Sequence, residues 1–101
     1  MKIPNKIKMF GYEWKIIRKK SQDCWSGNYY WQNHTIVLGT KNGGIQWEVL
    51  FHEITEAILT NLHYRFYGQE SSTEYQFIFN HTDLCRFVKE LHQIFKDNKL
   101  I

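Results

Sequence analysis

The chain has 101 residues, 43% of them hydrophobic and 17% aromatic, which fits one domain over residues 1–101. No stretch approaches the roughly 18 apolar residues of a membrane span, and the N-terminus MKIPNKIKMF lacks the apolar run of a secretory signal. The two cysteines, Cys24 and Cys85, lack the paired spacing of a metal site and are expected to be reduced thiols, so we expect a cytoplasmic protein. The net charge is only +3.

The first part of the chain predicts a β-hairpin that carries most of the positive charge. Segments 6–10 and 12–18 alternate apolar and polar residues, with Gly11 between them. Residues 1–25 hold seven Lys or Arg and two acids, a net +5, while residues 26–101 hold six and eight, a net −2. The block Arg18-Lys19-Lys20 leaves nucleic-acid binding open as a minority interpretation, but three charges are more typical of a solvated strand end.

A second pair of strands is expected at Tyr29–Trp31 and Thr35–Leu38, joined by Gln32-Asn33-His34. Turn-forming residues separate the predicted elements. They cluster at Ser21–Asn28, Gly39–Gly44 and Gly68–Ser72.

The second half of the chain predicts two helices with a short strand between them. Over residues 45–64, apolar side chains recur at helical spacing and share one broad face. A strand over residues 74–79 and an amphipathic helix over residues 83–95 follow, with Asn80 or Thr82 as the N-cap. The order predicts an α+β fold, a small and mostly antiparallel sheet with two main helices.

The first predicted helix carries a pattern typical of metal sites. His52 and Glu56 are four residues apart, so their side chains project from the same side of the helix, one turn apart. Glu53 follows the first of them, as the water-activating glutamate does in H-E-x-x-H metalloproteases. Zinc accepts carboxylate oxygen as well as imidazole nitrogen, so the spacing favours a zinc site. The alternative is a solvated pair of polar residues on an exposed helix face.

A catalytic zinc site usually has three protein ligands, so a third is needed. His63 lies roughly 10 Å along the helix from Glu56, too far for an unbroken helix to bring it back. His81, at the junction of a strand and a helix, is the better candidate. Asp83 is the fallback ligand or a partner that orients His81, and its ordinary role is that of an acid in the first turn of a helix.

The run VLFHEITEAI, residues 49–58, followed by FIFNHTDLCRF, residues 77–87, resembles the small phage and prophage proteins described as zinc metallopeptidases, which are similar to minimal zincins. The segment from Asp23 through Leu38 adds to this resemblance, which spans roughly residues 7–95. It implies a zincin-like fold, a zinc ion at His52 and Glu56, and Glu53 as general base. Glu56 departs from the usual second histidine.

If the protein is an enzyme, zinc-activated water attacks a peptide bond with Glu53 as the general base. A peptide or protein substrate is expected to add alongside Thr35–Leu38 through main-chain hydrogen bonds. A donor must also stabilise the oxyanion. The candidate donors are His34, Tyr64 and Tyr75.

The alternative is a non-catalytic interaction protein, a phage-encoded binder or inhibitor of a host protein built on the same scaffold. The sequence holds many large aromatic residues, and such residues are enriched at interface centres as well as in cores. The residues concerned are Trp14, Trp25, Tyr29, Tyr30, Trp31 and Trp47.

Overall fold

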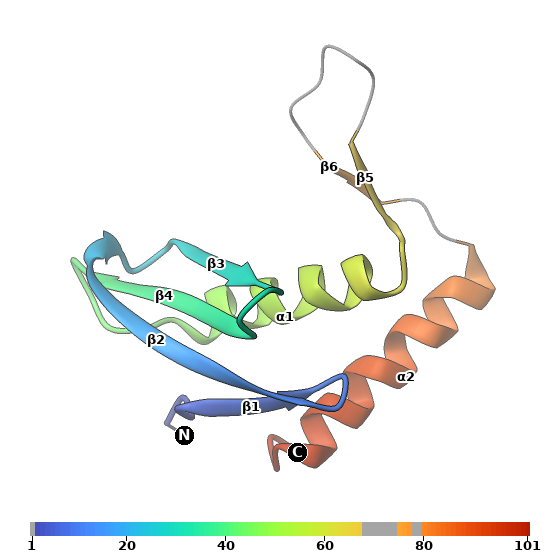
Figure 1. Cartoon of the computed structure of the whole chain (residues 1–101), viewed down its shortest axis with the longest axis horizontal. Coiled ribbons are helices and arrows are strands. Elements are labelled where there is room, and N and C mark those ends of the chain that lie inside the picture. Colours follow the sequence, from blue (N-terminus) through green and yellow to red (C-terminus); the bar gives the residue numbers. More distant parts are fainter. Residues whose placement is uncertain (1, 68–74, 78–79) are drawn as a thin grey trace. The chain divides into compact units, whose positions relative to one another are not determined.

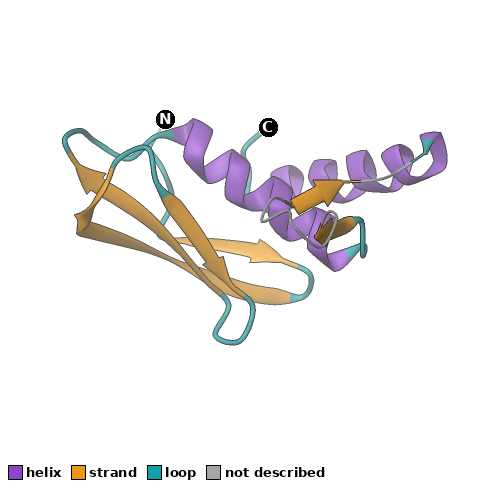
Figure 2. Ribbon diagram, turned by 90° about the horizontal axis from the view of Figure 1, so that it is seen from above, coloured by secondary structure: helices purple, strands orange, loops and turns teal. Residues whose placement is uncertain are grey.

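Four strands in the first part of the chain form one mixed sheet. The computed structural model describes residues 2–67, 75–77 and 80–101. The strands are β1 (Lys6–Met9), β2 (Tyr12–Asp23), β3 (Gly27–Tyr30) and β4 (Thr35–Lys41), in the order β1-β2-β4-β3 (Figure 1). Two neighbouring pairs are antiparallel, β1 with β2 and β3 with β4, whereas β2 and β4 run parallel. The strands are twisted relative to one another, as in most sheets (Figure 2).

The remaining elements are α1 (Trp47–Asn61), β5 (Arg65–Tyr67), β6 (Tyr75–Phe77) and α2 (His81–Asp97). The two short strands pair antiparallel. The predicted α+β class with two main helices is confirmed, and the sheet is mixed. The chain divides into two units, residues 1–54 and 55–101, with the boundary inside α1. Each unit is described by itself below, and the single domain over residues 1–101 stays a prediction. Neither helix in the described residues has the length and apolarity needed to cross a bilayer.

The sheet has two different faces. On the face that we call inner, the alternating residues of β1, β2 and β4 are fully or nearly fully buried: Ile7, Met9, Trp14, Ile16, Ile36 and Leu38. On the opposite, outer face the intervening residues of β1 and of the first part of β2 are exposed, among them Lys6, Lys8 and Lys15, whereas Thr35 of β4 is buried. The first turns of α1 cover the inner face, because a Cβ atom on Gly27 of β3 would lie 2.8 Å from a methyl group of Val49. This packing fixes the side of the sheet on which α1 lies.

The predicted hairpin is confirmed, and its turn consists of two residues with positive φ, Phe10 at 54° and Gly11 at 80°. These values match the type I′ turn that two-residue hairpins favour. The turn predicted over Ser21–Asn28 is wrong in extent, because β2 continues to Asp23 and β3 begins at Gly27. Near its end β2 advances four residues while β4 advances two, so the strand remains paired through an irregular stretch.

Strand β4 corrects two further predictions. It continues to Lys41, so the turn expected over Gly39–Gly44 starts later, at Asn42. It also lies between β2 and β3, with hydrogen-bonded neighbours on both sides. The expectation that a peptide adds alongside Thr35–Leu38 is therefore wrong, because an added strand needs an unpaired edge. Within this sheet the outermost strands are β1 and β3.

Helix α1 ends earlier than predicted. Its last residue is Asn61, and the chain leaves the helix where His63 adopts a φ of 62° and the Tyr64 N–H donates to the Leu59 carbonyl at 2.8 Å. Such a left-handed residue is a common helix ending. The next residues form β5, for which the sequence analysis gave no prediction.

Helix α2 confirms the predicted N-cap Asn80, whose side chain accepts from the Asp83 N–H, while the Asp83 carboxylate accepts from the Asn80 N–H. The strand predicted over residues 74–79 corresponds to β6 at Tyr75–Phe77. Its other residues, and the turn predicted at residues 68–72, lie outside the described residues.

Candidate metal centre

Three polar side chains of α1 converge. His52, Glu53 and Glu56 each offer one ligand atom, and these atoms lie within 4.8 Å of one another. Two atoms bonded to one zinc ion at about 2.0–2.2 Å lie at most about 4.4 Å apart, which is close to the observed separation. The expectation that His52 and Glu56 share one side of a helix is confirmed, and the group could hold a metal ion.

The three residues differ in exposure. His52 is exposed, Glu56 is half-buried, and Glu53 is buried with only 4% of its surface accessible. A carboxylate at this depth is costly to keep ionised unless hydrogen bonds or a cation compensate its charge. The group therefore combines a buried carboxylate with an imidazole that reaches solvent.

Gly27 of β3 is the reason that Glu53 can be buried. A Cβ atom at this position would lie 3.2 Å from the Glu53 Cγ atom and 3.3 Å from the Leu38 Cδ2 atom. The stem of Glu53 therefore lies directly over the glycine backbone. Because the same Cβ atom would lie 2.8 Å from the Val49 Cγ1 atom, a larger residue would force Val49 to move and would press on the Glu53 stem.

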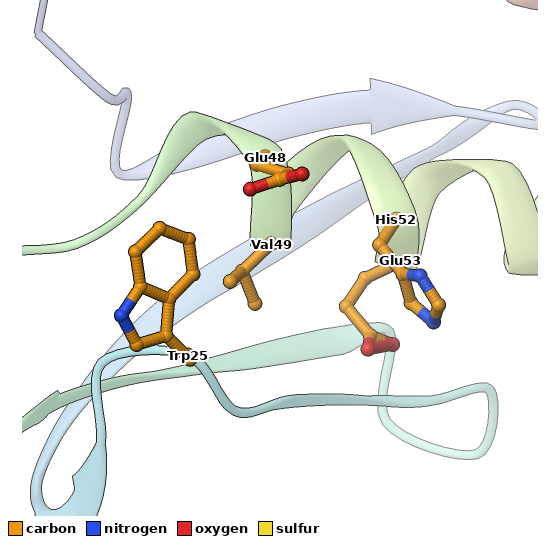
Figure 3. A pocket seen from close by; sticks show the side chains of 5 residues that line it. All are labelled: Trp25, Glu48, Val49, His52 and Glu53. Atoms are coloured by element: carbon orange, nitrogen blue, oxygen red, sulfur yellow. The ribbon is translucent and has the colours of Figure 1, made fainter.

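A pocket of about 280 Å³ adjoins the group. It is lined by Trp25, Glu48, Val49, His52 and Glu53. Figure 3 shows four of these side chains on consecutive turns of α1, with the indole of Trp25 beside Val49 and the imidazole of His52 beside the Glu53 carboxylate. The pocket therefore runs from a potential ion-binding group to an aromatic wall.

The turn that carries Trp25 is held by hydrogen bonds to the backbone and to one side chain. The Trp25 N–H donates to the Asp23 carboxylate at 2.9 Å, and the Cys24 N–H donates to the Lys41 carbonyl at 2.9 Å. The Gly39 N–H donates to the Ser26 carbonyl at 3.0 Å. The turn crosses Gly39 so closely that a Cβ atom there would lie 1.9 Å from the Asp23 carbonyl oxygen. A fixed turn thus presents an indole that is 62% exposed.

The other predicted site residues lie elsewhere on the chain. His81 is the first residue of α2, is exposed, and has its Nδ1 atom 3.8 Å from the Cys85 Sγ atom. Its role as third ligand stays a prediction. Asp83 has the ordinary role that the sequence offered for it, since its carboxylate closes the capping box of α2.

The candidate oxyanion donors also stay predictions. The His34 ring stacks on Tyr12 with centroids 4.0 Å apart, and Tyr64 is 9% exposed. Tyr75 lies in β6, and its side chain is outside the described residues.

Sequence reasoning missed three residues around the centre. Glu48 lies four residues before His52, so the same spacing that identified Glu56 could have identified it. Trp25 was noted only as one of many aromatic residues, and Gly27 only as part of a turn. No local signal in the sequence reveals that Gly27 lies under Glu53, because that contact joins residues 26 positions apart.

No family model, curated protein or solved structure matches the chain. The resemblance to minimal zincins therefore depends on the motif residues themselves.

Proposed function

We propose that the chain is a zinc-binding, metallopeptidase-like protein of the minimal zincin type, with His52, Glu56 and His81 as metal ligands and Glu53 as general base. One observation carries the proposal, the convergence of the ligand atoms of His52, Glu53 and Glu56 within 4.8 Å beside a pocket. Helical spacing alone brings these side chains close together, so the features that distinguish the group from a solvated polar face are the burial of Glu53 and the adjoining pocket.

The donor set suits zinc. Imidazole nitrogen and carboxylate oxygen are both ordinary zinc ligands, and a His₂Glu set is typical of catalytic sites with one position open. A zinc ion held there would supply a Lewis acid that makes water acidic near neutral pH. It would also compensate the charge of the carboxylates that α1 brings together.

The burial of Glu53 beside the pocket supports its proposed role as general base. Its carboxylate is buried in the wall of the pocket, where it can accept a proton from a water molecule and pass it to the leaving amine. Because Gly27 holds the stem of Glu53 against β3, the carboxylate is oriented before a substrate arrives.

The strand order suggests the edge of the sheet at which a peptide could pair. Strand β3 is an outermost strand of its sheet, and its first residue lies under Glu53. An extended peptide that pairs with the outer edge of β3 would therefore pass the candidate centre, which β4 cannot offer. The proposed substrate is a peptide or protein segment in extended conformation.

The variant Glu53→Gln tests the proposed base. It keeps the shape of the side chain but accepts no proton, so we expect about one zinc ion per chain as in the wild type and no cleavage of a peptide library read by mass spectrometry. Glu13→Gln is the matched control, because it makes the same chemical change on the outer face of the sheet. Cleavage by Glu53→Gln at the wild-type rate would disprove the mechanism.

A second candidate function is a phage-encoded protein that binds a host protein in the cytoplasm without catalysis. The observation that favours it is the exposure of two large aromatic side chains, Trp25 at 62% and Tyr30 at 48%. Capture of the same host protein by the wild type and by His52→Ala would support this function over the enzyme. Loss of capture in His52→Ala would count against it.

A further inference from the structure

The charges of α1 do not balance when a metal ion is placed at the candidate centre. Its sequence WEVLFHEITEAILTN contains three glutamates and neither lysine nor arginine. A divalent ion offsets the charges of Glu53 and Glu56. Glu48 then remains as a carboxylate in the lining of the pocket, so the pocket still attracts positive charge.

The residues that line the pocket suit a positive group carried on an aliphatic stem. Val49, which is 8% exposed, gives it an apolar surface, and the indole of Trp25 forms a wall that is 62% exposed (Figure 3). Indole is the side chain that attracts cations most strongly through its π face. A lysine or arginine side chain could use all three residues. Its aliphatic stem would contact Val49 and Trp25, and its charged group would interact with Trp25 and Glu48.

We propose that this pocket binds a lysine or arginine side chain of the peptide substrate, next to the bond that the candidate centre acts on. The inference rests on the proposed function, because that function supplies the peptide to which the side chain belongs. Trp25 and Glu48 are then the residues that determine specificity. A purely apolar side chain would contact Val49 and Trp25 but would leave the Glu48 carboxylate without a counter-charge inside the pocket.

Glu48 also lies in the first turn of α1, where an acidic residue stabilises the helix dipole. That role explains its charge but predicts no effect on peptide selectivity. The two roles therefore separate in a binding experiment, in which only the specificity role makes the preference follow the sign of the charge at position 48.

The experiment titrates the full chain, purified with zinc supplied, with three blocked peptides of the form acetyl-Ala-Ala-X-Ala-Ala-amide. X is lysine, norleucine or glutamate, so the first two share an aliphatic stem and differ in charge. The indole NH signal of Trp25, assigned with Trp25→Phe, reports occupancy by NMR, and mass spectrometry verifies that the peptide stays intact. We expect the lysine peptide to bind about tenfold more tightly than the norleucine peptide. A ratio below about threefold overturns the proposal.

Two variants and a control sharpen the result. Glu48→Lys is expected to reverse the preference, so that the glutamate peptide binds more tightly than the lysine peptide. Trp25→Ala is expected to reduce the affinity for the lysine peptide by about tenfold, measured by calorimetry because the reporting indole is lost. Glu13→Gln, which removes a charge from the outer face of the sheet, should leave the lysine preference unchanged. An unchanged preference in Glu48→Lys would assign Glu48 to the helix dipole alone and refute the inference.

Failure of this inference is distinguishable from failure of the proposed function. Zinc binding and peptide cleavage without a lysine preference would leave the proposed function standing and remove the specificity pocket. A lysine preference that follows the charge at position 48, in a chain that binds no zinc, would keep the pocket as a peptide-binding site and remove the enzyme.

Discussion

The inner and outer faces of the four-stranded sheet are built from the same strands but differ in burial and in charge. The inner face is buried and apolar, with Trp14 and Ile36 at 0% exposure, and it supports the helix that carries the candidate centre. The outer face carries exposed lysines and an ion pair between Lys6 and Glu13 at 3.1 Å. The site therefore depends on the packing beneath it, whereas the exposed lysines Lys6, Lys8 and Lys15 lie on the face away from it.

The largest effect is expected at the centre of the inner face. Trp14 is fully buried, its indole contacts Trp31 edge to face, and its Nε1–H donates to the Met9 carbonyl. Trp14→Ala removes this volume, so the free energy of unfolding should fall by about 3–5 kcal/mol. Chemical denaturation followed by circular dichroism measures the change. A loss below about 1 kcal/mol would mean that the inner face is not the core of this unit.

An intermediate effect is expected where the inner face meets α1. Gly27→Ala places a methyl group 2.8 Å from Val49 and 3.2 Å from the Glu53 stem, so we expect a loss of about 1–3 kcal/mol and weaker zinc binding. Val49→Ala makes room for that methyl group. The double variant should therefore lose less stability than the two single variants together. Strict additivity in denaturation experiments would contradict the contact between β3 and α1.

The smallest effect is expected one residue away from the core, on the outer face. Ile17 is 46% exposed while its neighbour Ile16 is 6% exposed, because successive strand residues point to opposite faces. Ile17→Thr should change the free energy of unfolding by less than about 0.5 kcal/mol. Ile16→Thr is the matched control and should cost about 2 kcal/mol or more. Equal losses would show that the two faces are not distinct.

The sequence predicted the parts of this fold that depend on local periodicity. The hairpin at Gly11, both helices and the N-cap Asn80 can each be predicted from the pattern of residues within the same short segment. The end of β2 leaves none, since residues 17–21 are exposed on both sides of the strand and only pairing with β4 keeps them extended. The end of α1 depends on the positive φ of His63, and a histidine in the sequence does not predict this conformation.

The candidate site also has features that the sequence predicts and features that it does not. Helical spacing predicted that His52 and Glu56 share one side of α1, because that relation is internal to the helix. The burial of Glu53, the glycine beneath it and the Trp25 wall all depend on contacts between α1 and β3 or the turn before it. Such contacts join distant parts of the chain, so no spacing rule could have revealed them.

The metal content of the purified protein shows whether His52, Glu56 and His81 bind zinc. Elemental mass spectrometry of the wild type, His52→Ala, Glu56→Ala and His81→Ala, each produced with zinc supplied, measures the number of ions per chain. Circular dichroism verifies that each variant is folded. We expect about one zinc ion in the wild type and its loss in each of these variants. A folded wild type without zinc, or one whose zinc survives His52→Ala, would contradict this expectation.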